Sequence, residues 1–235
     1  LYPHILLDRA KPGLIAVDGE GRRFVNEGVS YHDFVEAMYR SNETVPTIPA
    51  LLICDLSFVR KYGLGAIHPG TRSVRKFEKS GYVIRGDNID GLARRLGIDG
   101  GTLAQTVARH NRFAATGIDE DFGKGDTELN QFNGDPDNRP NPCLAPIDAP
   151  PFVAVAVWPA EIACSAGLAT NGDAQVLDSD NRPVDGLYAC GNDMASIMAG
   201  HYPGPGTTLG PALVFGYRAA KHAGGRASKT HDIDS

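Results

Sequence analysis

Residues 186–218 read GLYACGNDMASIMAGHYPGPGTTLGPALVFGYR. A strand is predicted to end at Cys190, and the glycine-rich turn at 204–206 leads directly into a helix predicted over 207–223. Glycines in such a turn let the backbone approach a flat ligand closely. The start of the helix adds unpaired N–H groups and a positive dipole end, which favour a phosphate or a developing negative charge. From spacing alone, a tight turn that caps a core helix explains the segment at least as well.

The spacing of Gly204, Gly206 and Gly210 superficially resembles a dinucleotide-binding fingerprint. Such a fingerprint directly follows a strand and opens a βαβ unit, with an acidic residue for the ribose about 20 positions later. Neither feature is found around these glycines. The sequence therefore predicts no complete dinucleotide-binding unit in this segment.

Strands are expected where short apolar runs are bounded by turn residues. They are 14–17, 50–54, 152–158 and the two arms of a hairpin, 174–177 and 186–190. An earlier hairpin is also expected, in which residues 22–25 return along 14–17 after a turn at 18–21.

Helices are expected at 31–40 and within 88–116. Ser30 is the predicted cap of the first helix, with Asp33 in the capping-box position, and Asp90 and Thr102 are the predicted caps in the second region. Residues 117–151 are polar and rich in Asp, Asn, Gly and Pro. So long a loop in a compact domain predicts a pinned, functional segment.

The bulk composition, with 42% hydrophobic and 22% charged residues, is that of a globular protein. The net charge of −5 gives no reason to expect nucleic acid or an anionic membrane as a partner. No apolar run reaches the ~18 residues that would indicate a transmembrane segment. The chain opens on Leu1 and an apolar stretch, so we expect its true amino terminus to lie elsewhere.

The four cysteines form no CxxC pair, and no two histidines have the spacing of metal ligands. The cysteines are Cys54, Cys143, Cys164 and Cys190. We therefore expect no metal site, and we expect reduced thiols in a cytoplasmic protein.

The segment 186–218 resembles the carboxy-terminal motif of the FAD-dependent 3-ketosteroid dehydrogenases, within the fumarate reductase flavoprotein superfamily. Residues 21–31 are similar to that family's entry into its substrate domain, and 90–123 to the helices and loop of the same domain. The resemblance implies an α+β fold. It divides the chain into a substrate (cap) domain at 1–160 and the carboxy-terminal part of an α/β FAD-binding domain at 161–235.

The family's amino-terminal GxGxxG unit has no counterpart in this sequence. The resemblance therefore implies that FAD is held mostly by an amino-terminal part that is missing here. We expect the isolated chain to hold little FAD and to be inactive.

The resemblance also implies a reaction, the removal of two hydrogens from adjacent carbons near a steroid 3-ketone. Tyr31 matches the family's base, and the Tyr202 hydroxyl and Gly206 backbone N–H match the donors that polarise the ketone oxygen. The alternative for each of these residues is a packing or turn role. Flavin contacts are implied for a larger set in the same motif, namely Gly191, Asn192, Asp193, Gly204, Thr207, Thr208 and Leu209. For Asn192 and Asp193 the alternative is that they only pin the loop.

Two other functions remain open at this point. A dicarboxylate oxidoreductase of the fumarate reductase type needs arginines to pair with its substrate. Residues 183–217 contain neither Arg nor Lys, which favours a neutral, hydrophobic ketone, with a steroid as the implied class and an external electron acceptor as the implied partner. The second alternative is that the chain by itself is an inactive substrate-cap fragment.

Overall fold

The computed structural model describes residues 2–4 and 8–231, with side chains described as far as Gly225. The chain forms two compact units, Leu1–Pro159 and Ala160–Ser235, and each is described here by itself. Both contain helices and antiparallel strands, so the predicted α+β class is confirmed. The functional assignment of the two predicted domains stays a prediction.

The first unit is built on a four-stranded antiparallel sheet with the order β1-β2-β4-β3. Its strands are β1 (Leu14–Val17), β2 (Ala50–Asp55), β3 (Ile84–Gly86) and β4 (Phe152–Val157). Leu14 pairs with Cys54 across β1 and β2, and Ala50 pairs with Val157 across β2 and β4. Every residue of β1 and β2 is buried, so both faces of the sheet must be covered.

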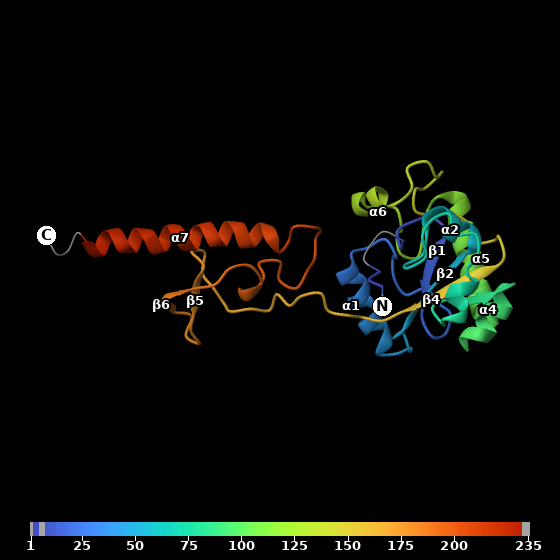
Figure 1. Cartoon of the computed structure of the whole chain (residues 1–235), viewed down its shortest axis with the longest axis horizontal. Coiled ribbons are helices and arrows are strands. Elements are labelled where there is room, and N and C mark those ends of the chain that lie inside the picture. The colour runs from blue at the N-terminus through green and yellow to red at the C-terminus, as the bar shows by residue number, and fades with distance from the viewer. Residues whose placement is uncertain (1, 5–7, 232–235) are drawn as a thin grey trace. The chain divides into compact units, whose positions relative to one another are not determined.

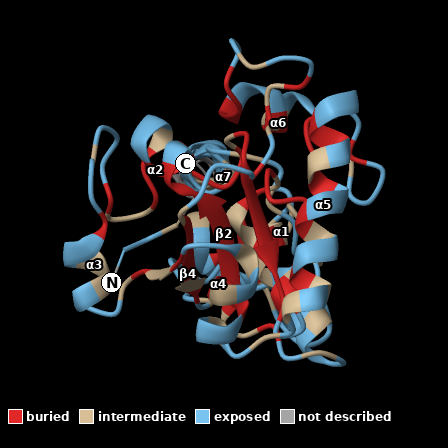
Figure 2. Cartoon of the chain, turned by 90° about the vertical axis from the view of Figure 1, so that its right-hand side faces the viewer, coloured by how far each residue is buried: buried red, intermediate tan, exposed pale blue. Residues whose placement is uncertain are grey.

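Helices cover each face of this sheet, because alternate strand residues point in opposite directions. Leu14 and Leu52 pack with α1 (Tyr31–Asn42) and α2 (Leu56–Tyr62). Ile15 and Ile53 pack with α4 (Ile89–Leu96) and α5 (Gly100–Thr116) on the opposite face. A short helix, α3 (Arg75–Lys79), precedes β3. Figure 2 shows the buried strands between helices whose outer faces are exposed.

The helix caps follow the predicted pattern only in part. Ser30 caps α1 by accepting a hydrogen bond from the Asp33 N–H at 3.1 Å, as predicted. The predicted caps Asp90 and Thr102 are wrong, because both residues lie inside helices that begin earlier. Asn88 caps α4 and Asp99 caps α5, each accepting from a backbone N–H three residues later.

The hairpin predicted over 13–25 is also wrong beyond its turn. The turn itself forms, with the Asp18 N–H donating to the Arg22 carbonyl at 2.9 Å. After a single bridge between Val17 and Arg23 the chain leaves the sheet, and β1 pairs along its whole length with β2 instead. Residues 24–30 therefore lack the backbone hydrogen bonds of a paired strand. Buried side chains, described below, hold this segment instead.

The long segment 117–151 contains one helix, α6 (Glu128–Asn133), and is otherwise irregular. Its predicted pinning is confirmed, because buried amides fasten it along its length. The Asn141 side chain donates to the Gly117 carbonyl at 3.0 Å and to the Lys124 carbonyl at 3.2 Å. Whether the segment is functional stays a prediction at this stage.

The second unit contains a hairpin, a short turn of 3-10 helix and a long helix (Figure 1). They are β5 (Gln175–Leu177), β6 (Pro183–Tyr188), η1 (Gly191–Asp193) and α7 (Leu209–His231). The predicted hairpin is confirmed, and α7 starts two residues later and ends eight later than the predicted 207–223. No helix in the described part of the chain is long and apolar enough to cross a membrane.

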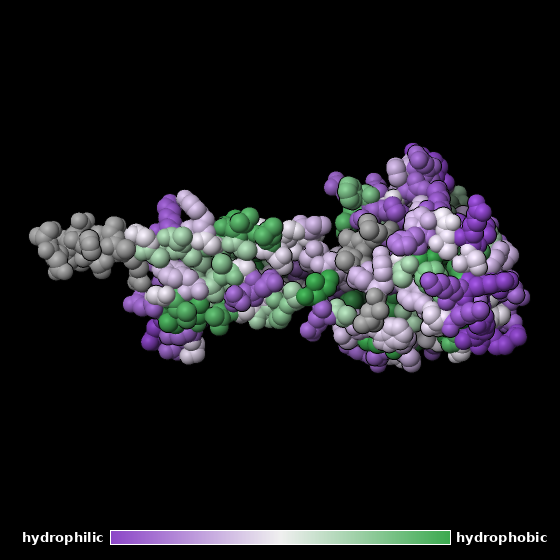
Figure 3. Space-filling model, in the orientation of Figure 1, coloured by the Kyte–Doolittle hydropathy of each residue, from purple (hydrophilic) through white to green (hydrophobic). Residues whose placement is uncertain are grey.

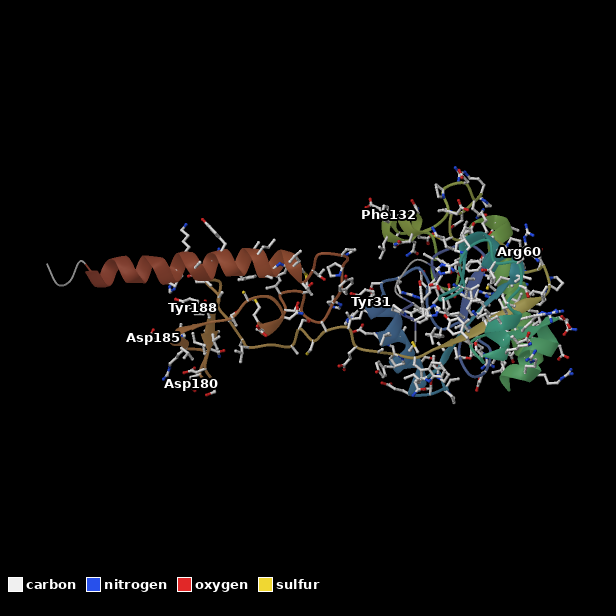
Figure 4. All side chains as sticks on the ribbon, in the orientation of Figure 1. Tyr31, Arg60, Phe132, Asp180, Asp185 and Tyr188 are labelled. Carbon is white, nitrogen blue, oxygen red and sulfur yellow. The ribbon has the colours of Figure 1, made fainter. Side chains whose placement is uncertain are left out.

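Two side-chain pairs fasten α7 to the hairpin region of the second unit. The Tyr188 hydroxyl lies 2.8 Å from His222 Nδ1, and Figure 4 marks Tyr188 at the end of β6. Arg218 donates to the Gly172 carbonyl and pairs with Asp173 at 3.1 Å. These polar contacts add to the packing of Phe215, on the same helix, against the buried Val176, Ala189 and Met194.

Candidate active-site segments

The turn after β6 packs closely on α7. Gly191 has φ +63°, a left-handed conformation that favours glycine. A Cβ at this position would lie 3.2 Å from the Cβ of Ala212 on α7. The Asp193 carbonyl accepts a hydrogen bond from the Leu168 N–H at 2.8 Å, which fixes the other end of the turn. The side chains of Asn192 and Asp193 are exposed, so a ligand can reach them.

The turn before α7 leaves its backbone open. Gly206 has φ +94°, which restricts this position to glycine. A Cβ on Gly204 or Gly206 would meet no atom within 4 Å. The Gly206 carbonyl already accepts a bond from the Gly210 N–H at 2.8 Å, so the first helical turn is in place. A flat ligand therefore has room on the side of this backbone where a Cβ would otherwise stand.

An apolar groove of about 410 Å³ lies beside the same helix start. Gly206 and Thr207, two residues predicted to be in the site, line it. The rest of its lining is mainly apolar, namely Ile197, Met198, Pro205, Gly210, Pro211, Val214 and Phe215. These apolar residues were not predicted. Their signal was available in the sequence, since Pro211, Val214 and Phe215 recur at positions that share one helix face.

Tyr202 is half-buried in the irregular segment between η1 and α7. Ala199, three residues earlier, has φ +51°, which is uncommon for a residue with a side chain. The His201 N–H donates to the Met198 carbonyl at 3.0 Å, so the strained turn is closed by a backbone bond. Strain of this kind is concentrated at ligand sites and motivates the role proposed below.

Tyr31 belongs to the first unit, where it is the first residue of α1 and is half-buried (Figure 4). Gly191, Gly206 and Thr207 belong to the second unit, where they lie beside or just before α7. The structure therefore gives two sets of candidate residues, one set in each unit.

A buried network of charged side chains lies just before Tyr31 in the chain. Arg23 pairs with Glu27 at 2.8 Å and with Asp119 at 2.8 Å, and all three side chains are almost fully buried. The fully buried Lys124 ammonium lies 3.3 Å from Glu27 and donates to the Leu14 carbonyl at 2.7 Å. These groups join the segment after β1 to the long segment 117–151.

The network keeps its carboxylates ionised. Burial alone would raise the pKa of Glu27, but the charges of Arg23 and Lys124 outweigh it and hold that pKa well below its usual range. Burial would also raise the pKa of Asp119, but its hydrogen bonds and charge interaction with Arg23 outweigh this effect, so the pKa is lowered. Burial also lowers the pKa of the neighbouring His110 to about 4, so this histidine is neutral near pH 7.

Two buried asparagines continue this network toward Tyr31. The Asn26 side chain donates to Asn130 Oδ1 at 2.9 Å and accepts from the Gly28 N–H at 2.8 Å. The Asn130 side chain donates to the Gly28 carbonyl at 2.8 Å and accepts from the Gly125 N–H at 3.0 Å. Neither asparagine was predicted as a functional residue. The polar character of 117–151 was the only sequence signal that pointed toward Asn130.

Known proteins resemble this chain along most of its length. The family described as an FAD binding domain matches residues 2–209. The chain is 41% identical to a 4-oxocyclohex-2-ene-1-carboxylate 5-dehydrogenase of Sinomonas cyclohexanicum, over 97% of this chain and 38% of that protein. It is 36% identical to a 3-oxosteroid 1-dehydrogenase of Mycobacterium tuberculosis, over 95% of this chain and 41% of that protein.

The fold of this chain is also similar to that of a solved structure. The crystal structure of 3-ketosteroid delta1-dehydrogenase from Sterolibacterium denitrificans, in complex with 1,4-androstadiene-3,17-dione, matches with a TM-score of 0.87 at 42% sequence identity. The match covers 93% of this chain and 40% of that chain. The chain thus spans about two fifths of the length of the relatives it matches.

Proposed function

The chain belongs to the FAD binding domain family, and we propose that it is part of a flavin-dependent dehydrogenase that oxidises a CH–CH bond beside a ring ketone. The family resemblance stated for residues 186–218 is confirmed by these matches. The observation that carries the proposal is the open, glycine-lined start of α7 beside an apolar groove.

The residues at this helix start suit a flavin. The Cβ directions of Gly204 and Gly206 point into open space, so the edge of an isoalloxazine ring has room to approach there. We assign Thr207, Thr208 and Leu209 to the same contact, because a helix start favours the negative charge that a reduced flavin carries. Gly191, Asn192 and Asp193 form the adjoining turn and complete the proposed flavin contacts. FAD, when bound, would accept the hydride.

The protein side of the reaction is assigned to three residues. The Tyr202 hydroxyl and the Gly206 N–H donate hydrogen bonds to the ketone oxygen, which stabilises the charge that develops when the neighbouring carbon loses its proton. Tyr31 takes that proton at its phenolic oxygen. Because a tyrosine has an unperturbed pKa near ~10, Tyr31 needs assistance from another group to act near neutral pH.

The substrate is proposed to be a neutral 3-ketosteroid. The groove is mainly apolar, and no Lys or Arg occurs in residues 183–217. A dicarboxylate would need such cations, which disfavours a fumarate reductase type of substrate. The 41% identity to a 4-oxocyclohexene carboxylate dehydrogenase favours a second candidate, a monocyclic oxo acid, whose single carboxylate would also need a cationic partner.

Both substrate classes can be compared directly in the full-length protein. We expect kcat/KM for a 3-ketosteroid to exceed that for 4-oxocyclohexanecarboxylate. The reverse order would replace the steroid with the monocyclic oxo acid as the proposed substrate.

The assigned roles are tested with Tyr202→Phe and Tyr31→Phe in the full-length protein. Loss of one oxyanion donor reduces kcat by roughly 10²–10³-fold in other enzymes, and we expect Tyr202→Phe to fall in this range. A non-reactive 3-ketone should bind less tightly to Tyr202→Phe and nearly normally to Tyr31→Phe, since only the first change removes a donor to the ketone. Unchanged turnover in Tyr202→Phe would return Tyr202 to a packing role.

A further inference from the structure

The backbone that leads into Tyr31 is fixed by hydrogen bonds at every residue from 27 to 30. Arg9 donates to the Glu27 carbonyl at 2.9 Å, and the Val29 N–H donates to the Asn26 carbonyl at 3.3 Å. The Ser30 carbonyl accepts from the Phe34 N–H at 3.0 Å, which is the first bond of α1. At Gly28, the N–H donates to Asn26 and the carbonyl accepts from Asn130.

Asn130 is the partner in this set that comes from the long segment 117–151. Its amide uses both ends, because Nδ2 donates to Gly28 while Oδ1 accepts from Asn26 and Gly125. The side chain is only 1% exposed, so water does not compete for these bonds. The Asn130 side chain thus ties the long segment to the turn that precedes Tyr31, about 100 residues earlier in the sequence.

The fit between Gly28 and Asn130 is close as well as polar. A Cβ on Gly28 would lie 2.9 Å from the Asn130 side-chain carbon and nitrogen. Asn130 is itself held in place, since its N–H is bonded to the α6 cap Thr127 at 3.2 Å and its carbonyl accepts from Cys143 Sγ at 3.1 Å. Because Asn130 is held by these bonds, we expect it to fix the position of Gly28 rather than to move with Gly28.

We propose that Asn130 is a positioning residue for Tyr31, fixing the Gly28 backbone three residues before it and hence the place of the tyrosine hydroxyl. This inference rests on the proposed role of Tyr31 as the base. A base must lie within hydrogen-bond reach of the proton that it removes, and a displacement of about 1 Å far from the chemistry can cost about 10²-fold in rate. In this scheme Asn130 acts on Tyr31 through the backbone at Gly28, to which it is bonded.

The test compares two isosteric changes on the same helix in the full-length, flavin-loaded protein. Asn130→Asp keeps the acceptor for Asn26 and Gly125 but replaces the donor that faces the Gly28 carbonyl. Asn133→Asp is the matched control, because Asn133 is also a buried amide of α6 but donates only to Leu129 within that helix. Gly28→Ala is a second probe that pushes Gly28 and Asn130 apart and removes no polar group.

We expect Asn130→Asp and Gly28→Ala to lower kcat by ~10- to 100-fold with KM within about twofold of wild type, as displacement of a base predicts. The deuterium isotope effect for substrate labelled at the carbon that loses the proton should rise, because proton removal becomes slower. Flavin content and the flavin absorbance spectrum should stay at wild-type values. Asn133→Asp should show none of these kinetic changes.

Three outcomes would overturn the proposal. They are a kcat for folded Asn130→Asp equal to that of Asn133→Asp, a loss of kcat with an unchanged isotope effect, and failure of both Asn130→Asp and Gly28→Ala to fold. The last would mean that the contact serves stability alone. If instead Tyr31→Phe removes protons at the wild-type rate, the proposed base is wrong. If kcat falls in Tyr31→Phe but stays at the wild-type value in Asn130→Asp, only the positioning role of Asn130 is rejected.

Discussion

The two compact units bury their apolar side chains to very different extents. The first unit packs two large clusters, one against each face of its sheet. The second has one small cluster, in which Val176, Ala189 and Met194 are buried and Phe215 packs against them. Many of its large apolar side chains are exposed, namely Ile162, Leu168, Val184, Leu187, Ile197, Leu209, Leu213, Val214 and Tyr217.

Figure 3 shows hydrophobic residues gathered on the visible surface of the second unit, whereas hydrophilic residues dominate that of the first. Large apolar patches on a protein surface mark places where another surface binds. The comparison shows that the first unit has a core on both faces of its sheet, whereas the second combines one small core with an exposed apolar surface and the open helix start. The predictions below test this contrast, beginning with the largest effect.

Separating the units should give the clearest contrast. We expect residues 1–159 to unfold in urea with one cooperative transition, because both faces of the sheet are covered within that unit. We expect residues 160–235 to show no cooperative transition, because a core of so few buried side chains cannot offset the loss of chain entropy. Circular dichroism during a urea titration measures both. A sharp transition in 160–235 would break the comparison.

Glu27→Gln should strongly destabilise the first unit. It leaves the buried Arg23 and Lys124 without their shared carboxylate. Removing one partner of a buried ion pair typically costs about 3–5 kcal/mol in the free energy of unfolding. Urea denaturation of the 1–159 fragment, in parallel with the unsubstituted fragment, measures the difference. A loss below about 1 kcal/mol, the range of exposed pairs, would show that water reaches these charges.

The first unit should lose stability as the pH falls. The folded-state pKa of His110 is lowered from 6.5 to about 4, so the unfolded chain binds this proton first and stability declines between those values. The decline from His110 is on the order of 3 kcal/mol. The lowered pKa values of Glu27 and Asp119 extend the loss to more acid pH, since their stabilisation is present above their unfolded pKa values and lost below them.

The histidine contribution is isolated by His110→Gln, which retains a donor for the Ala145 carbonyl. Denaturation of both 1–159 fragments at pH 7 and pH 5 should give a smaller pH dependence for the variant. Equal dependence in the two fragments would assign the whole effect to the carboxylates.

An exposed ion pair in the second unit should contribute least. Asp173 and Arg218 are each about half exposed, so Asp173→Asn should change stability by no more than about 1 kcal/mol. The thermal midpoint of the full-length protein measures this change at low and high salt. A fall in the midpoint well beyond what about 1 kcal/mol produces would mean that the Asp173–Arg218 pair contributes more than an exposed ion pair does.

The sequence predicted best what depends on local pattern. The strands at 50–54 and 152–158, the Ser30 cap and the carboxy-terminal hairpin were all expected at nearly the observed positions. The turn at Gly204 and Gly206 before the last helix was also expected. That it binds a ligand stays a prediction, which rests on the family resemblance.

What could not be predicted depends on contacts between distant residues. The partner of β1 is β2 rather than the nearby 22–25, because Arg23 and Asn26 turn inward to side chains about 100 positions later. The roles of Lys124 and Asn130 could not be inferred either, since a buried Lys or Asn has no periodic signal in a polar loop. The caps at Asn88 and Asp99 were missed because several candidate cap residues lie close together there.

The strand order has a consequence for the synthesis of this protein. β4 occupies an interior position between β2 and β3, yet it is the last strand of its unit to leave the ribosome. Until residue 157 has emerged, β2 has an unpaired edge and β3 has no neighbour in the sheet. An open apolar edge of this kind promotes pairing with other chains. The nascent chain therefore passes through a period in which a chaperone that covers the β2 edge would protect it from aggregation.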